Sequence, residues 1–209
     1  MAKSGALAKV YQVVRELGVV DGVLYLLDAL LARVTRGRAR IYKYRLVAQP
    51  IAANAVAALR NDPTTVISAV FPNDALVQTF PRPPSVIRER YRQGASCLTA
   101  VVKGQFAGYL WWVRDRYVED EVRCVFELEQ PALSVWDFYV FVTPSYRFGR
   151  TLARLWAHAN HELASQGIRW SFSRISAFNK SSITAHSRLG TVICHTALFF
   201  RTCSRGCDR

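Results

Sequence analysis

The stretch from Ser134 to Leu155 constrains the fold more than any other part of this 209-residue chain. Its first part, from Val135 to Val142, is apolar, aromatic and β-branched, which is typical of a buried strand. Pro144 ends this run, a short basic loop follows, and apolar residues then recur at the spacing of one helix face. They are Leu152, Leu155, Trp156, Ala159 and Leu163. The sequence therefore predicts a strand, a loop and a helix in succession.

The start of this predicted helix is a candidate anion site. The first backbone N–H groups of a helix have no partner within it, and the helix dipole adds partial positive charge there. Arg147 and Arg150 stand beside them in the sequence. We therefore expect the loop to bind an anion, with phosphate as the leading candidate.

The charge of the chain favours anionic partners. Its 28 Lys and Arg residues against 15 Asp and Glu residues leave a formal charge of +13. Such a balance suits an anionic ligand, nucleic acid or an acidic membrane surface, and it also suits a basic surface that merely keeps the protein soluble. Nucleic-acid binding ranks last, because no zinc-finger or RRM signature accompanies the charge.

Cysteine usage predicts reduced thiols and no metal site. The five cysteines are an odd number, are scattered, and follow no secretory signal, which favours a cytoplasmic location. A metal site made of Cys203, Cys207 and His195 is not expected, because the cysteines do not form a C-x-x-C pair and no fourth ligand is evident.

Two amphipathic helices, broken near Gly18, are expected over residues 4–35. Arg15, Asp21 and Asp28 interrupt their apolar stripes well before a membrane span would be complete. Two interpretations of these apolar stripes are open. In the first they pack on the domain or on a second copy in a homodimer, and in the second they lie on the anionic inner face of a membrane. The basic residues that would help the second use are Arg33, Arg36, Arg38, Arg40, Lys43 and Arg45.

The remaining pattern predicts a single α+β domain. We expect a helical extension over residues 1–38, a domain over 39–201 and a short basic tail over 202–209. Within the domain, strands are expected over 41–51, 64–70, 97–102, 106–113, 121–129, 135–142, 168–175 and 191–201. Helices are expected over 52–60, 85–92 and 179–190, besides the one that follows the basic loop.

Two segments resemble the signatures of the GNAT acyltransferase superfamily. Val142-Thr-Pro-Ser-Tyr-Arg147-Phe-Gly-Arg150 is similar to its acyl-CoA loop, and Asn179-Lys-Ser-Ser182-Ile-Thr-Ala-His186-Ser-Arg-Leu-Gly190 is similar to its second motif. Lys103-Gly-Gln-Phe-Ala-Gly108-Tyr is a weaker match. The likeness extends from about Cys97 to Phe200.

The resemblance implies a mixed, splayed central sheet flanked by helices, with acyl-CoA between two parallel strands. It implies cofactor contacts from residues at the strand end, in the loop and in the second motif. They are Phe141, Val142, Arg147, Phe148, Gly149, Arg150, Thr151, Asn179 and Ser182. The loop departs from the family pattern, because Arg150 and Leu152 stand where that pattern has glycine or alanine, and only Gly149 supplies backbone freedom.

The resemblance also implies two catalytic residues. His186 stands where the family often has a tyrosine that protonates the CoA thiolate, although a packing histidine is an equal alternative. Asp137 is the first choice as general base, ahead of Glu127 and Glu129, and a solvated or paired carboxylate is the alternative for each.

The function implied is acetyl transfer from acetyl-CoA to an amine by direct attack in a ternary complex, with no metal. The alternative is a binding or membrane-associated scaffold that keeps the fold but has lost the cofactor. The acceptor is not indicated by the sequence.

Overall fold

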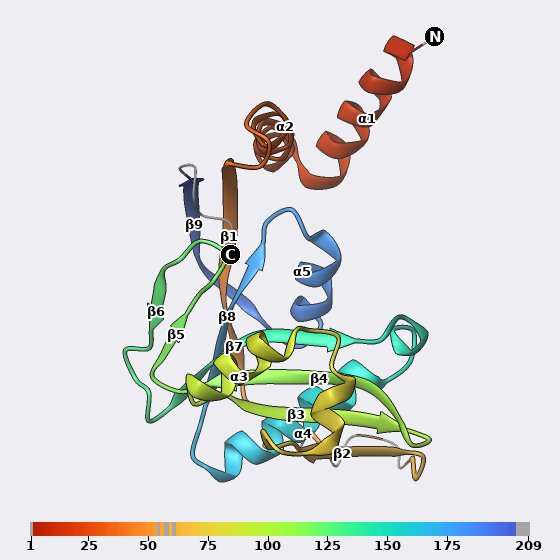
Figure 1. Cartoon of the computed structure of the whole chain (residues 1–209), viewed down its shortest axis with the longest axis vertical. Helices are drawn as coiled ribbons and strands as arrows, with labels where there is room; N and C mark the ends of the chain where they lie inside the picture. Colours follow the sequence, from red (N-terminus) through yellow and green to blue (C-terminus); the bar gives the residue numbers. More distant parts are fainter. Residues whose placement is uncertain (1, 54, 57–58, 60–61, 204–209) are drawn as a thin grey trace. The chain divides into compact units, whose positions relative to one another are not determined.

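The computed structural model describes residues 2–53, 55–56, 59 and 62–203, with side chains from Leu7 onward. The chain forms two compact units, which can be followed by colour in Figure 1. Unit 1 comprises residues 1–49 and 174–209, and unit 2 comprises residues 50–173. Residues 204–209, most of the predicted tail, lie outside the described residues, and so do residues 54, 57–58 and 60 of the helix expected over 52–60. The described residues of that stretch are not helical.

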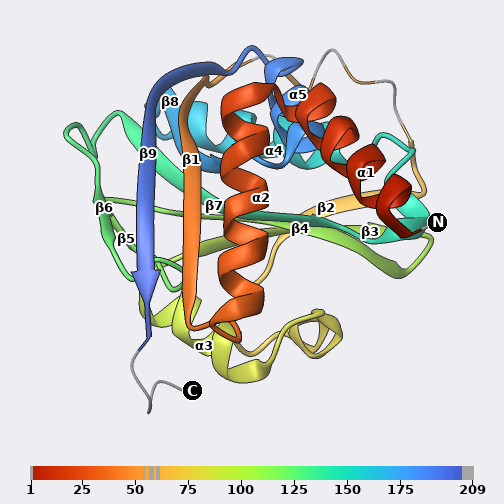
Figure 2. The same ribbon diagram turned by 90° about the horizontal axis from the view of Figure 1, so that it is seen from above.

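Unit 2 is built on a mixed sheet with the strand order β2-β3-β4-β7-β8. Neighbouring strands are antiparallel except β7 and β8, which are parallel. The strands are β2 (Thr65–Ala69), β3 (Ser96–Val102), β4 (Gln105–Val113), β7 (Ser134–Val142) and β8 (Trp170–Ser176), the last of which continues into unit 1. Helices α3 (Pro84–Arg92) and α4 (Thr151–Ser165) cover opposite faces of this sheet, as Figure 2 shows. The predicted α+β class, with a mixed sheet between helices, is confirmed.

Shorter elements complete unit 2. They are the 3-10 helices η1 (Ala75–Thr79) and η2 (Pro144–Tyr146) and the hairpin of β5 (Arg116–Val118) with β6 (Val125–Glu127). The strand expected over 121–129 is therefore wrong in length. The carboxylate of Glu119 accepts a hydrogen bond from the Val122 amide at 2.6 Å, and this local bond turns the chain before β6 begins.

Strand β7 changes its pairing near Asp137. Its registered pairs with β8 end at Trp136–Phe172. Against β4, Trp111 pairs with Tyr139 and Trp112 pairs with Asp137, so Phe138 is one extra residue, a β-bulge. From Asp137 to Val142, β7 has registered partners only on its β4 side among the described residues. The divergence of the two parallel strands that the resemblance implied thus begins at Asp137.

Unit 1 pairs the first and last strands of the chain. β1 (Ala39–Pro50) and β9 (Val192–Thr202) are antiparallel, from Ala39 opposite Thr202 to Ala48 opposite Val192. The amide of Ala177, just after β8, donates to the carbonyl of Lys43 on β1 at 2.8 Å. The short helix α5 (Lys180–Ser187) comes next in the chain.

The two predicted N-terminal helices are present as α1 (Ala2–Leu17) and α2 (Val19–Val34). Gly18 separates them with a φ of 83°, a left-handed conformation that glycine adopts without strain. None of the described helices is long and apolar enough to cross a bilayer.

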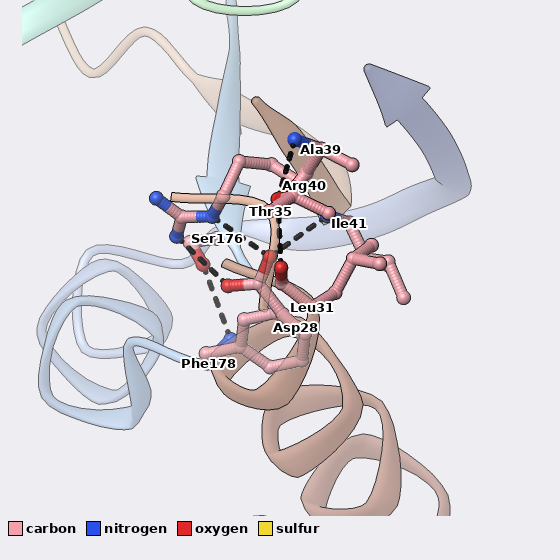
Figure 3. Close-up of polar contacts among 8 residues, drawn as sticks. All are labelled: Asp28, Leu31, Thr35, Ala39, Arg40, Ile41, Ser176 and Phe178. Carbon is pink, nitrogen blue, oxygen red and sulfur yellow. Dashed lines mark hydrogen bonds and ion pairs between the residues drawn. The ribbon is translucent and has the colours of Figure 1, made fainter. Parts of the chain in front are cut away.

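A buried carboxylate attaches α2 to β1, as Figure 3 shows. Asp28 accepts hydrogen bonds from Nε and Nη2 of Arg40 at 2.9 and 2.8 Å and from the Ile41 amide at 2.8 Å. Thr35, at the end of α2, donates to the Leu31 carbonyl. The hydrogen bond from Arg40 is the main reason that the pKa of Asp28 is lowered.

A second carboxylate of α2, Asp21, pairs with Lys43 and Arg45 of β1. Three of the six basic residues named for membrane contact, Arg40, Lys43 and Arg45, therefore have carboxylate partners within unit 1. The other sides of α1 and α2 expose apolar residues, among them Leu7, Tyr11, Val19, Val20, Leu30 and Val34. Contact with a membrane or a second copy stays a prediction, which cosedimentation with anionic vesicles and the mass in solution would check.

Candidate functional site

The loop between β7 and α4 is stabilised by its own hydrogen bonds. The Arg147 amide donates to the Pro144 carbonyl at 3.3 Å, and the Gly149 amide donates to the Tyr146 carbonyl at 3.2 Å. The Arg147 side chain folds back, and its Nε donates to the Val142 carbonyl at 3.1 Å. Two of the amides expected to bind phosphate, those of Arg147 and Gly149, are thus already engaged inside the loop.

The start of α4 retains free donors. Arg150 is its N-cap residue, no side chain caps the helix, and its first turn contains no acidic residue. The Arg154 amide donates to the Arg150 carbonyl at 2.9 Å. In this described segment the amides of Phe148 and Arg150 have no acceptor, and those of Thr151 to Ala153 have none within the helix. This end of α4 therefore retains the donors and the dipole that favour an anion.

The side chains of the loop face solvent. Arg147 and Arg150 are exposed, and the Phe148 side chain is fully exposed. Gly149 is not in the left-handed region, and a Cβ there would lie 3.4 Å from the Tyr146 carbonyl oxygen, an ordinary contact. The backbone at Gly149 thus accepts other residues, and the role of Gly149 toward a phosphate stays a prediction.

The end of β7 depends on another glycine. A Cβ on Gly108 of β4 would lie 2.4 Å from the Phe141 carbonyl oxygen and 3.2 Å from Cα of Val142. The Thr143 amide continues the ladder by donating to the Ala107 carbonyl at 2.9 Å. Only glycine permits so close an approach of the two strands, and it fixes Phe141 and Val142 in place.

Asp137 is buried where β7 and β8 stop pairing. Ser171 Oγ donates to its Oδ2 at 2.7 Å, and Ser173 forms a further hydrogen bond with it. Burial raises the pKa of Asp137 to about 7, because loss of solvation outweighs the hydrogen bonds that favour the carboxylate. The alternatives Glu127 and Glu129 are exposed.

The second motif forms the start of α5 in unit 1. Asn179 is the N-cap, and its Oδ1 accepts hydrogen bonds from the Ser182 amide at 3.0 Å and from Ser181 Oγ at 2.8 Å. Asn179 therefore caps α5. His186, near the end of α5, is buried, and burial lowers its pKa.

Comparison with known proteins decides the fold. No protein-family model matches the sequence, and no curated protein matches it either. Among solved structures, a tandem GNAT protein from the clavulanic acid biosynthesis pathway has a TM-score of 0.54 at 16% identity, covering 87% of this chain and 60% of that one. A GNAT-family protein from Novosphingobium aromaticivorans has a TM-score of 0.51 at 14% identity, covering 80% of this chain and 69% of that one. The chain has the GNAT fold.

A further GNAT structure is similar over a small part of its length. It is the GCN5-related glucosamine N-acetyltransferase region of a fungal multi-domain β-N-acetylglucosaminidase. Its TM-score is 0.54 at 14% identity, and the match covers 82% of this chain and 22% of that one. The resemblance noted in the two sequence motifs is therefore confirmed at the level of the fold.

The GNAT fold places the predicted residues in two groups. Asp137 and the stretch from Phe141 to Thr151 lie in unit 2, on β7, in the loop and at the start of α4. Asn179, Ser182 and His186 lie in unit 1, on and just before α5. Their roles toward a cofactor or a substrate remain predictions.

Sequence reasoning missed the serines that bind Asp137. Ser171 and Ser173 alternate with Trp170 and Phe172 in a segment predicted only to be a strand. Small hydroxyl residues on the buried side of such a strand are the signal that would have indicated a polar partner there. The bulge at Phe138 left no signal in the sequence, because it depends on the pairing with β4.

Proposed function

We propose that the protein is an acyl-CoA-dependent N-acyltransferase that transfers an acetyl group to an amine. One observation carries the proposal: the uncapped, acid-free start of α4 follows a strand whose edge from Asp137 to Val142 lacks a registered partner on its β8 side. Backbone donors beside an open strand edge suit a diphosphate joined to an extended amide-containing arm. The N-acetyltransferase region among the similar structures supports the same class of reaction.

In this proposal, acetyl-CoA supplies a thioester whose carbonyl carbon is attacked by the free amine. The C–N bond forms, the C–S bond breaks, and the sulfur leaves as a thiolate. The amides of Phe148 and Arg150 and the first turn of α4 bind phosphate oxygens, with the exposed guanidinium groups of Arg147 and Arg150 beside them. Phe141 and Val142 present main-chain groups to the arm of the cofactor, and the contacts expected from Asn179 and Ser182 of unit 1 stay predictions from the sequence.

Asp137 is the proposed acceptor of the amine proton. A pKa of about 7 makes the carboxyl able to take a proton near neutral pH and to return it afterwards. Ser171 holds one carboxyl oxygen at 2.7 Å and so fixes the orientation of the group.

His186 is less suited to donate a proton. Burial lowers its pKa, so that its ring is mainly neutral at pH 7 and carries no proton that it releases readily. We propose that solvent protonates the thiolate at neutral pH, and that His186 serves as a donor only in more acidic solution. At pH 8, where the ring is neutral, a His186→Gln variant should keep its turnover within about twofold of wild type. A loss of 100-fold or more at pH 8 in steady-state kinetics would instead make the neutral ring essential.

Calorimetric titration with CoA and acetyl-CoA tests the proposal directly. We expect binding, and we expect Arg150→Gln to weaken it about tenfold at low salt, because one charge-assisted contact with phosphate is lost. Arg169→Gln is the matched control, since Arg169 is also exposed but follows the other end of α4. Its affinity should be unchanged. Failure of both ligands to bind folded protein at millimolar concentration would rule the enzyme out and leave only the fold.

A further inference from the structure

One face of the unit 2 sheet carries two guanidinium groups over aromatic rings. The guanidinium carbon of Arg90, on α3, lies 4.4 Å from the ring centre of Tyr139, 5.4 Å from that of Phe138 and 5.3 Å from that of Trp111. Phe138 and Tyr139 are consecutive residues, which in a regular strand would point to opposite faces. The β-bulge at Phe138 brings both rings beneath Arg90.

Arg82 reaches the same tyrosine. Its guanidinium carbon lies 4.7 Å from the Tyr139 ring centre, and both Nε and Nη2 donate to the Tyr139 hydroxyl, the former at 3.0 Å. Arg82 is exposed, so this side of the cluster is open to solvent. The Tyr139 oxygen accepts the hydrogen bonds from Arg82, so the Tyr139 O–H group can itself donate a hydrogen bond to a bound acceptor.

Two further polar groups of the cluster are buried, Nη1 of Arg90 and the hydroxyl of Tyr109. In the described part of the chain neither forms a hydrogen bond of ordinary length and angle, although Arg90 lies close enough to the Tyr109 oxygen to interact with it. Burial raises the pKa of Tyr109 to about 12, so that its hydroxyl stays protonated. Buried donors without acceptors are costly in a folded protein, and a bound acceptor would remove that cost.

No acidic side chain neutralises these donors. Within residues 62–203, neither Arg82 nor Arg90 forms an ion pair. The pKa of Arg82 is raised chiefly by the hydrogen bonds that it donates to Tyr139, and the carboxylate of Asp120, which is exposed, is the smallest of several causes. The cluster therefore offers only donors and positive charge, which is the chemistry that recognises a carboxylate or a phosphate.

We propose that Arg82, Arg90 and Tyr139 bind the carboxylate or phosphate group of a small molecule. This site goes beyond the proposed acyl transfer and does not depend on it. Asp137 immediately precedes Phe138 and is paired with Trp112, so it points to the face of the sheet opposite Arg90, Phe138 and Tyr139. The cluster is therefore a site separate from Asp137.

The test measures binding to the full-length protein without any acyl-CoA. Each probe pair differs in one anionic group: phenylalanine against phenylalaninamide, and O-phosphoethanolamine against ethanolamine. Calorimetry should give at least tenfold tighter binding for the anionic member of one pair, and the pair that responds distinguishes carboxylate from phosphate. Added salt should weaken that binding, since the attraction is electrostatic.

Variants assign the effect to the cluster. Arg82→Gln and Arg90→Met should each lower the affinity for the anionic probe about tenfold and leave that for the neutral probe unchanged. Arg88→Gln, an exposed arginine on the same helix α3, should lower neither. Because Arg82 is exposed, its variant keeps the test valid even if Arg90→Met does not fold.

Two results would overturn the inference: equal affinity for the anionic and neutral members of both pairs, or a preference that survives both Arg82→Gln and Arg90→Met. Either result leaves the proposed function intact if CoA still binds in the separate titration. Conversely, if the anionic probes bind but CoA does not, the proposed acyltransferase function is ruled out and the anion-binding site is supported.

Discussion

An Asp137→Asn variant should be more stable than wild type at pH 8 by on the order of 4 kcal/mol, and equally stable near pH 4. The reason is the burial that raises the pKa of Asp137 from an ordinary 3.8 to about 7. Between these two values the folded protein holds a proton that the unfolded chain has released, so the free energy of unfolding falls as the pH rises. Three pKa units correspond to the stated energy at about 1.4 kcal/mol each.

The sign of this effect follows from the raised pKa. The contribution of Asp137 to stability is fully present below about pH 4 and is lost as the pH rises through about 7. Asparagine resembles the protonated carboxyl and does not titrate, so the variant lacks this dependence. Urea unfolding of both proteins from pH 4 to pH 8 measures it, and taking the difference between them removes the contributions of other groups. A difference that stays constant with pH would show that Asp137 titrates normally.

The same variant separates a catalytic carboxyl from a structural one. If Asp137 takes the amine proton, acyl transfer should fall by 100-fold or more while stability rises. Such a gain of stability with loss of activity is typical of functional sites. Unchanged transfer rates in a stabilised variant would make Asp137 a structural residue only.

A Gly108→Ala variant should lose about 3 kcal/mol of stability. The new Cβ would lie 2.4 Å from the Phe141 carbonyl oxygen and 3.2 Å from Cα of Val142. Both are backbone atoms, so relief requires β4 and β7 to move apart rather than a side chain to rotate. The displaced residues are the proposed contacts of the cofactor arm, and the affinity for CoA should therefore fall as well.

Gly149→Ala is the matched control for Gly108→Ala. It adds the same methyl group at an exposed loop position where the shortest contact would be an ordinary 3.4 Å. Its free energy of unfolding should change by less than about 0.5 kcal/mol. Equal losses in the two variants would show that the close approach of β4 and β7 is not what requires glycine.

Local patterns in the sequence predicted the elements well, because each depends on neighbouring residues. The run from Val135 to Val142, the helical spacing after Leu152 and the break at Gly18 all appear where they were expected. The family likeness rested on two short motifs, and the structures with the same fold are at most 16% identical in the comparisons described above.

The candidate site could be predicted only in part, because its decisive contacts join distant residues. Ser171 meets Asp137 from 34 positions away, so neither the burial of Asp137 nor its raised pKa could be read from the residues around it. The sequence also did not indicate which of two glycines the structure requires. Gly149 is structurally replaceable, whereas Gly108, noted only within a weaker motif, is held against the backbone of β7.

The carboxylates of α2 make the first 38 residues hard to separate from strand β1. Asp28 and Asp21 are the counter-charges of Arg40, Lys43 and Arg45, and Asp28 also accepts the Ile41 amide. A shortened chain that starts at Ala39 would leave a row of cations and an unsatisfied main-chain donor along its own first strand. Truncation of the helices would therefore damage β1 in addition to removing any partner contact. Polar substitutions on the exposed apolar side of α1 are the cleaner way to ask what that side contacts.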